Sequence, residues 1–217
     1  MDTLEQAPRG MTGALMSAQP LLRLGAPLEY FHETIIGKLI NTSACLRVEF
    51  DIAANLAEKL KRAELDVVVA TQQTPVSGIE YRKIDTEHFL LVGPAAARPP
   101  RMEGGNASAI PRVQTWLSYG ADMPIIRRYW QDVFKQRPAF QAAMVMPNLH
   151  AIAKAVESGL GISVLPEYPC RAALKSKRLK MLWKSRHVVS NDLWIAYGKA
   201  ERNNVEIIRL RNVLGAK

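Results

Sequence analysis

The chain has 217 residues, of which 48% are hydrophobic and 23% are charged, so it contains ample material for a folded core. Its two cysteines, Cys45 and Cys170, are too few for a disulfide framework, and no apolar run is long enough to span a membrane. We therefore expect a globular protein of a reducing cytoplasm, built as one large domain or two small ones, rather than a disulfide-stapled or membrane-spanning chain.

The net charge of +9 is unevenly distributed along the chain. Residues 98–187 contain 15 Lys and Arg against 5 Asp and Glu, whereas the rest of the chain is nearly neutral. A basic surface attracts nucleic acid or anionic partners, but no DNA-reading motif and no interleaved aromatic residues accompany the basic run at 171–186. We interpret this run as a solvated surface.

The first part of the chain alternates between predicted strands and helices. Residues 1–20 have little pattern and are predicted to be a tail or the remnant of a linker, without the charged start and apolar core of a secretory signal. Strands are then predicted at 21–24, 45–50 and 65–70, separated by helices at 28–40 and 53–64. This alternation is typical of an α/β domain.

The middle of the chain is predicted to contain a crossing between domains. Residues 79–92 are interpreted as two short strands, with a break at Asp85–Thr86. The stretch 93–105 is rich in small residues and proline and lacks apolar periodicity, which favours a hinge. The charge of the chain also changes at this point.

The second part of the chain repeats the α/β pattern. A strand is predicted at 113–118, and Asp122 is predicted to cap a helix that has Pro124 in its first turn. The segment 140–168 then predicts a strand at 144–146, a helix from 149, glycines at 159 and 161, and a buried strand at 162–165. A strand, helix and strand in this order form a βαβ unit, which implies parallel strands.

The end of the chain is predicted to return to the first domain. Strands are expected at 179–183 and 193–197, and a helix at 205–214. We predict lobe I from residues 21–95 plus 188–217, with lobe II inserted as residues 96–187. Two crossings would then join the lobes.

Four stretches of this sequence, in order, resemble the effector-binding domain of LysR-type bacterial transcription regulators. They are the strand and turn at 22–27, the helix and strand at 56–70 (LAEKLKRAELDVVVA), the paired strands at 78–94, and the helix and strand at 148–166. The resemblance covers about residues 20–215. It implies a fold like the type II periplasmic solute-binding proteins, with two Rossmann-like lobes, a hinge and a cleft between the lobes.

The resemblance also implies a function and partners. The chain would sense a small-molecule effector in the interlobe cleft and form a homodimer or tetramer, with a helix of one lobe meeting the opposite lobe of its partner. Such regulators normally begin with a winged helix-turn-helix domain and a linker helix, and neither is visible in this sequence. DNA would thus be contacted only through an N-terminal domain not present in this chain, and no membrane is expected as a partner.

The candidate site residues lie where predicted strands end, because ligands of α/β sheets bind beyond those ends. Matching positions in the family place Ala26, Pro27 and Leu28 at the cleft, and their lack of hydroxyls favours an apolar or mixed ligand. Thr71 and Gln72 either donate to a ligand or form an ordinary polar turn. The remaining candidates are Tyr119, Asn148 and Pro166, together with one of the neighbouring arginines Arg127 and Arg128, for which we take Arg127. Asn148 also suits a helix cap.

Two other classes of protein compete with the regulator hypothesis. A stand-alone solute-binding protein would have the same fold, as would an enzyme, but no acid/base, nucleophile or dinucleotide-binding motif is found. His32, His88, His150 and His187 are scattered without metal-ligand spacing, so we expect neither a metal site nor a cofactor. The sequence therefore predicts a sensor and not an enzyme.

Overall fold

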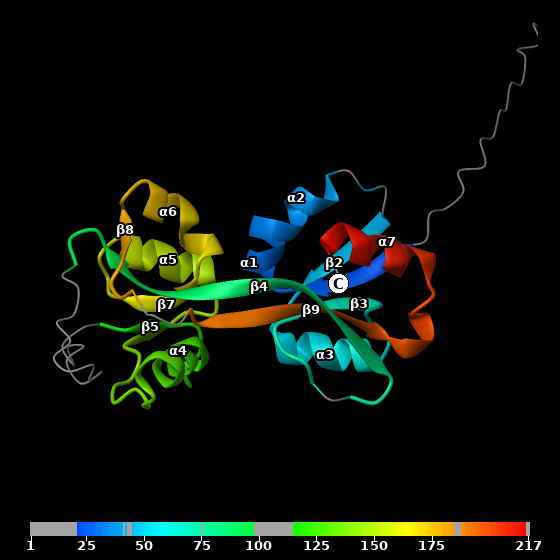
Figure 1. The fold of residues 1–217 in the computed structure, drawn as a ribbon, viewed down its shortest axis with the longest axis horizontal. Helices are drawn as coiled ribbons and strands as arrows, with labels where there is room; N and C mark the ends of the chain where they lie inside the picture. Colours follow the sequence, from blue (N-terminus) through cyan, green and yellow to red (C-terminus); the bar gives the residue numbers. More distant parts are fainter. Residues whose placement is uncertain are drawn as a thin grey trace, which may run out of the picture.

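The structure is a computed structural model that describes residues 21–40, 42, 45–74, 76–97, 115–184 and 188–215. Figure 1 shows two α/β lobes joined by a pair of long antiparallel strands, β4 (Ile79–Pro94) and β9 (Ser190–Gly198). The predicted two-lobed α/β fold is confirmed. The predicted tail at 1–20 and the greater part of the predicted hinge, from 98 to 105, lie outside the described residues.

Lobe I is built on three parallel strands, which stand in the sheet in the order β2-β1-β3 and are followed by the antiparallel β9. The strands are β1 (Leu21–Ala26), β2 (Cys45–Phe50) and β3 (Val67–Ala70). One continuous helical segment follows β1 and comprises α1 (Leu28–Tyr30), the wider π-type turn η1 (Phe31–Ile35) and α2 (Ile36–Leu39). The lobe is completed by α3 (Ala53–Lys61), η4 (Lys199–Glu201) and α7 (Val205–Leu214).

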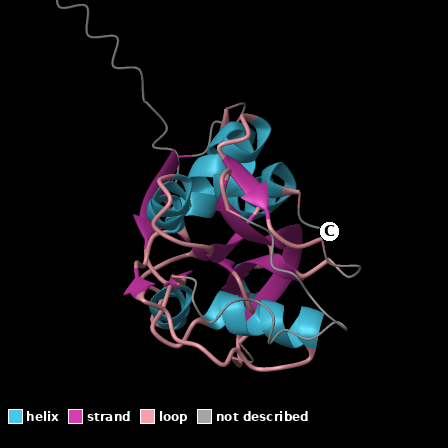
Figure 2. Ribbon diagram, turned by 90° about the vertical axis from the view of Figure 1, so that its left-hand side faces the viewer, coloured by secondary structure: helices cyan, strands magenta, loops and turns pink. Residues whose placement is uncertain are grey.

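Lobe II repeats this arrangement of strands. The parallel pair β5 (Leu117–Ser118) and β6 (Met144–Val145) is joined by a parallel bridge between Trp116 and Ile162 to β7 (Ser163–Pro166). The second half of β4 then pairs antiparallel with β7 and with β8 (Leu179–Met181). The helical elements are α4 (Pro124–Phe134), α5 (Leu149–Glu157), η3 (Tyr168–Cys170) and α6 (Arg171–Lys175). The order β6-β5-β7-β4 thus matches β2-β1-β3-β9, and Figure 2 shows helices on both sides of the strands.

The turn residues around α5 explain why this helix begins and ends where it does. The Asn148 side chain accepts a hydrogen bond from the backbone N–H of Ala151 at 2.7 Å, so the predicted N-cap is confirmed. Gly159 has φ +85°, the left-handed conformation that favours glycine after a helix. A Cβ atom at Gly161 would lie 2.3 Å from the carbonyl oxygen of Thr115, so only glycine allows β7 to approach the neighbouring strand.

Two local predictions were wrong. The chain from Ile79 to Pro94 is one strand, because a shift in the ladder between Lys83 and Asp85 absorbs the irregularity that was interpreted as a break. Asp122 does not cap α4: Met123 occupies the N-cap with φ +51°, and Asp122 instead pairs with Arg127 at 2.8 Å.

The core runs through both lobes. Its largest cluster joins buried residues of β1 and β3 in lobe I to the buried face of α5 and to β7 in lobe II. Tyr30 and Tyr168 meet edge to face across the lobes, with ring centroids 5.9 Å apart. A second cluster lies within lobe II around Trp116 and Trp130. Among the described helices, none is both long and apolar enough to cross a membrane.

The division of the chain into lobes stays a proposal. Residues 89–92 of β4 pair with β7 and residues 92–94 pair with β8, both in lobe II, whereas residues 79–88 pair with β9. This pairing supports a crossing near Glu87, within β4, instead of one after residue 95. The return crossing would lie near the start of β9.

Candidate functional site

A cavity of about 360 Å³ lies between the facing ends of the two lobes. Residues directly after the three parallel strands of lobe I line one side: Pro27 after β1, Asp51 after β2, and Thr71 with Gln72 after β3. The other side is lined by residues at or beyond the strand ends of lobe II, namely Tyr119, Leu149, Pro166 and Tyr168. All six carboxyl ends of parallel strands therefore contribute to one cavity, as expected for ligand sites of α/β sheets.

The side chain of Asn191, near the start of β9, connects the parts of the cavity wall. Its Nδ2 donates to the carbonyl oxygen of Thr71 at 2.8 Å and to Oε1 of Glu87 at 3.0 Å. Its Oδ1 accepts a hydrogen bond from Nη1 of Arg128 at 2.6 Å. One amide thus ties lobe I, the crossing strand β4 and helix α4 of lobe II together.

Glu87 is an acidic group in a poorly solvated part of this wall. Its side chain is buried, with 8% of the residue exposed, and burial raises the pKa of its carboxyl above the ordinary value. Hydrogen bonds from Asn191 and Tyr168 and the charge of Arg128 act in the opposite direction, but burial is the larger cause. A ligand that offers a positive charge or a hydrogen-bond donor would therefore interact favourably with this carboxyl.

Glu29 is a second buried carboxylate on the cavity wall, with 5% of the residue exposed. Its Oε1 accepts a hydrogen bond from the backbone N–H of Leu149 at 2.7 Å, at the start of α5. An acidic group is stabilised at a helix N-terminus, where unpaired N–H groups concentrate positive partial charge. This contact fastens the first helical segment of lobe I to α5 of lobe II.

The cavity is acidic on balance and apolar over much of its wall. Asp51 adds a third carboxylate, and its pKa is lowered chiefly by hydrogen bonds from the side chain of Asn55 and the backbone N–H of Ile52. Arg128 faces these groups as the basic side chain of the lining, while Phe89 and Ile125 supply apolar surface. The carboxylates of Glu29 and Asp51 and the buried carboxyl of Glu87, against one guanidinium, favour a ligand that carries positive charge or hydrogen-bond donors.

The structure brings five of the nine predicted site residues to this cavity. Pro27, Thr71, Gln72, Tyr119 and Pro166 line it, whereas Ala26, Leu28, Arg127 and Asn148 do not. Each of the latter is next to a lining residue in the sequence. Arg127 is turned to Asp122 on the surface, and Arg128 is the arginine that faces the cavity. Asn148 instead caps α5.

Sequence reasoning missed the residues that dominate the polar chemistry of the wall. Glu87 and Asn191 lie on β4 and β9, away from the ends of the parallel strands, so the rule based on strand ends could not find them. Glu29 lies one residue beyond the predicted stretch 26–28. No local pattern marked Glu87, because it follows Asp85 and Thr86 in a polar stretch of β4.

Comparison with known families agrees with this architecture. The family model described as the LysR substrate binding domain matches residues 17–216. The chain is similar to the HTH-type transcriptional regulator AbaB of Streptomyces antibioticus, with 28% identity over 172 residues, covering 73% of this chain and 56% of AbaB. It is also similar to the nitrogen assimilation regulatory protein nac of Escherichia coli (strain K12), with 32% identity over 122 residues, 55% of this chain and 38% of that protein. The chain thus spans about half the length of these relatives or less.

Solved structures share the fold at low sequence identity. ArgP from Mycobacterium tuberculosis superimposes with a TM-score of 0.77 and 15% identity, covering 93% of this chain and 68% of ArgP. The regulatory domain of OxyR2 from Vibrio vulnificus, in a cysteine-to-serine mutant form, gives a TM-score of 0.74 and 17% identity, covering 91% of this chain and 95% of that domain. These likenesses show a common fold.

Proposed function

The chain belongs to the LysR substrate-binding domain family, and from this premise we propose that it is the effector-sensing and oligomerisation domain of a bacterial LysR-type transcription regulator. In this proposal a small molecule enters the interlobe cavity and changes the angle between the lobes. The new angle would alter how paired domains orient their DNA-binding partners.

The observation that carries the proposal is the convergence of six strand ends on one cavity between two lobes. The cavity volume of about 360 Å³ lies within the range of small-molecule sites. Its polar wall also reaches across the lobes, because Asn191 contacts Thr71, Glu87 and Arg128. A ligand that contacts this network touches both lobes at once, so its binding free energy depends on the angle between them.

The lining supports an effector of mixed character with a cationic group. Glu29, Asp51 and Glu87 offer carboxyl oxygens, while Phe89 and Ile125 offer apolar contact. A small amine with an aliphatic or aromatic body satisfies both kinds of surface. We propose Arg128, in place of Arg127, as the group that would meet an acceptor on the same molecule.

Ligand-induced thermal stabilisation tests this proposal. The protein is incubated with basic amino acids and simple aliphatic or aromatic amines, and in parallel with carboxylates of the same size that lack the amine. We expect the melting temperature to rise with the amines and not with the matched carboxylates, because a ligand that binds the folded state stabilises it by mass action.

Variants at the wall make the result specific. Glu29→Gln and Glu87→Gln are expected to reduce the affinity of the stabilising amine at least about tenfold, the scale of a lost charge-assisted hydrogen bond. Arg127→Ala, which removes an exposed arginine outside the cavity, is the control and should leave affinity unchanged. Stabilisation by carboxylates alone, or equal binding to all three variants, would contradict the proposed effector class.

Oligomerisation and DNA contact are further parts of the proposal. Ile36 on α2 and Ile40, the C-cap residue of that helix, are 46% and 75% exposed, which supports an apolar contact with a second copy. Light scattering after size exclusion is expected to give a homodimer or tetramer, and Ile36→Glu is expected to shift it toward monomer. DNA would be contacted through an N-terminal domain, in the cytoplasm, by the full-length regulator.

Incubation of the stabilising ligand with the protein discriminates the proposal from the enzyme hypothesis. Chromatography should recover the ligand unchanged, and formation of a product would favour an enzyme on the same fold. A stand-alone solute-binding protein would bind the ligand as a monomer and show no ligand-dependent change in assembly. A sensing domain is instead expected to change its assembly or the angle between its lobes.

A further inference from the structure

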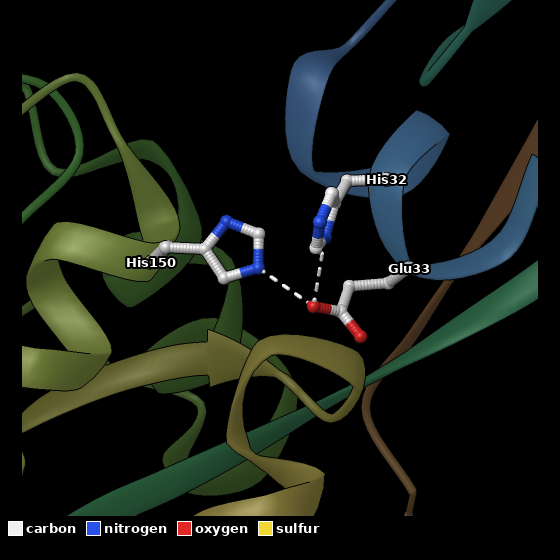
Figure 3. A group of neighbouring side chains, drawn as sticks. All are labelled: His32, Glu33 and His150. Carbon is white, nitrogen blue, oxygen red and sulfur yellow. Dashed lines mark hydrogen bonds and ion pairs between the residues drawn. The ribbon is translucent and has the colours of Figure 1, made fainter. Parts of the chain in front are cut away.

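Three side chains of metal-ligand type converge at the edge of the contact between the lobes, outside the cavity (Figure 3). His32 and Glu33 come from the π-type turn η1 of lobe I, and His150 comes from the first turn of α5 in lobe II. Nε2 of His150 lies 2.8 Å from Oε1 of Glu33, and Nδ1 of His32 lies 3.2 Å from the same oxygen. One ligand atom from each residue lies within 4.8 Å of the other two.

We propose that His32, Glu33 and His150 bind a zinc-type divalent cation and that the bound ion ties lobe I to lobe II. Imidazole nitrogen and carboxylate oxygen are ligands that Zn²⁺ prefers, and three protein ligands with water in a fourth position make a complete tetrahedral site. The sequence pointed away from a metal site because 117 residues separate Glu33 from His150. The fold brings these two residues into contact.

The present distances require small adjustments to hold an ion. Bonds of about 2.0–2.1 Å in a tetrahedron place neighbouring ligand atoms about 3.3 Å apart. The two contacts to Glu33 are already 2.8 and 3.2 Å long. The imidazole rings stand nearly perpendicular, at 87° with centroids 5.4 Å apart, so their nitrogens can approach one point without the rings colliding.

The chemistry of the cluster also suits an ion. Ring nitrogens of His150 and His32 both lie beside the same carboxyl oxygen of Glu33, so the three ligand atoms already face one another. The side chains of His32, Glu33 and His150 are 65%, 30% and 35% exposed, which leaves a path for the ion and room for water. Wider turns of this π type are rare within helices and occur often at functional sites.

The position of the cluster gives the ion a structural consequence. One helical turn before Glu33, Glu29 accepts the hydrogen bond from the N–H of Leu149, so two successive turns of the same segment contact the start of α5. An ion at the outer contact would hold this edge of the cleft closed. Coupling to an effector rests on the proposed function above, whereas binding of the ion itself does not.

Titration of the untagged, chelator-stripped protein with ZnCl₂ in a calorimeter tests the site. We expect one Zn²⁺ per chain, with affinity reduced at least tenfold by His32→Ala, by His150→Ala and by Glu33→Gln. His88→Ala is the matched control, because it removes an exposed histidine outside the cluster and should leave the affinity unchanged. Absence of binding to the wild-type protein, or equal affinity in all variants, would overturn the proposal.

Cobalt substitution distinguishes this cluster from the exposed thiol of Cys45. Co²⁺ in the proposed site should give the visible absorption of a nitrogen- and oxygen-ligated ion, lost in His150→Ala and kept in Cys45→Ser. A thiolate-to-cobalt band that disappears in Cys45→Ser would place the ion elsewhere and overturn the proposal. So would variants that lower the melting temperature by the same amount with and without zinc, because they would show an ion pair and no metal ligand.

Discussion

At the scale of single residues, Asn191 does what neither a carboxylate nor an alcohol could do in its place. It donates two hydrogen bonds from Nδ2, to Thr71 and Glu87, and accepts one at Oδ1 from Arg128. A carboxylate of the same shape has no donors, and an alcohol is too short to span the three partners. The amide therefore joins the lobes because it has the length to reach all three partners and offers both donors and an acceptor.

Replacement of Asn191 by aspartate keeps the shape and removes both donors. We expect Asn191→Asp to lower the free energy of unfolding by about 1–3 kcal/mol at neutral pH, because the new carboxylate would face the buried Glu87 and leave the Thr71 carbonyl unpaired. Urea unfolding measures the loss. Asn203→Asp, at an exposed turn, is the control and should stay within about 0.5 kcal/mol of the wild type.

Glu87 makes the stability of the fold depend on pH. Burial raises the pKa of its carboxyl in the folded state, so the folded chain binds this proton more tightly than the unfolded chain. The stability linked to Glu87 is therefore fully present below the unfolded pKa and is lost as pH rises through the folded pKa. In urea unfolding, Glu87→Gln and the wild type should have similar free energies of unfolding at acid pH. As the pH rises, the variant should become increasingly more stable than the wild type. A constant difference from acid to neutral pH would contradict this assignment.

At the scale of elements, the segment from α5 to β7 shows how a few small residues fix the position of a helix. Asn148 begins the helix, Gly159 ends it in a left-handed conformation, and Gly161 lets β7 lie against Thr115. These features place Leu149 at the cavity and His150 beside Glu33. A substitution that displaces this segment would therefore move residues of both candidate sites.

A methyl group at Gly161 tests the close approach. Gly161→Ala would place Cβ 2.3 Å from the carbonyl oxygen of Thr115, and we expect it to cost about 1–3 kcal/mol of stability, as overpacking does. Gly37→Ala is the matched control, because nothing lies within 4 Å of its added Cβ. In the helix interior that change should be neutral or stabilise by about 0.5–1 kcal/mol. Equal effects of the two substitutions would contradict the close contact.

The elements also show what local sequence patterns can and cannot predict. The bounds of β2 and α7 were predicted as observed, because apolar spacing and flanking polar residues mark both ends. The break predicted at Asp85–Thr86 was wrong, because a polar pair inside a strand can be accommodated by a bulge whose partner strand, β9, lies far away in the sequence. Strand ends likewise predicted five residues of the cavity wall, whereas Glu87 and Asn191 depended on the pairing of β4 with β9.

At the scale of the whole molecule, the two lobes are separate in outline and joined in their core. The largest hydrophobic cluster extends from β1 and β3 to α5 and β7, and the contact between Tyr30 and Tyr168 bridges the lobes. The long strand β4 pairs with β9 at one end and with β7 and β8 of lobe II at the other. We therefore expect the lobes to unfold together.

A core substitution in lobe I should consequently destabilise lobe II as well. Leu24 is fully buried, and Leu24→Ala is expected to cost about 2–5 kcal/mol. In a Trp194→Phe background, fluorescence reports on tryptophans 116, 130 and 183 of lobe II, and its urea transition should shift together with that of far-ultraviolet circular dichroism. Two transitions, with the tryptophan signal unmoved, would show that the lobes unfold independently.

The position of β9 has a consequence for how the protein is made. This strand lies between β3 and β4 in the sheet, yet it follows all of lobe II in the sequence. While the ribosome adds residues 71–189, the apolar edge of β3 has no neighbour on that side, for an interval on the order of 10 s at ordinary rates of translation. An unpaired edge of this kind invites pairing with other chains. The nascent protein therefore passes through a stage in which this edge is open to other chains, and this stage ends only when β9 leaves the ribosome.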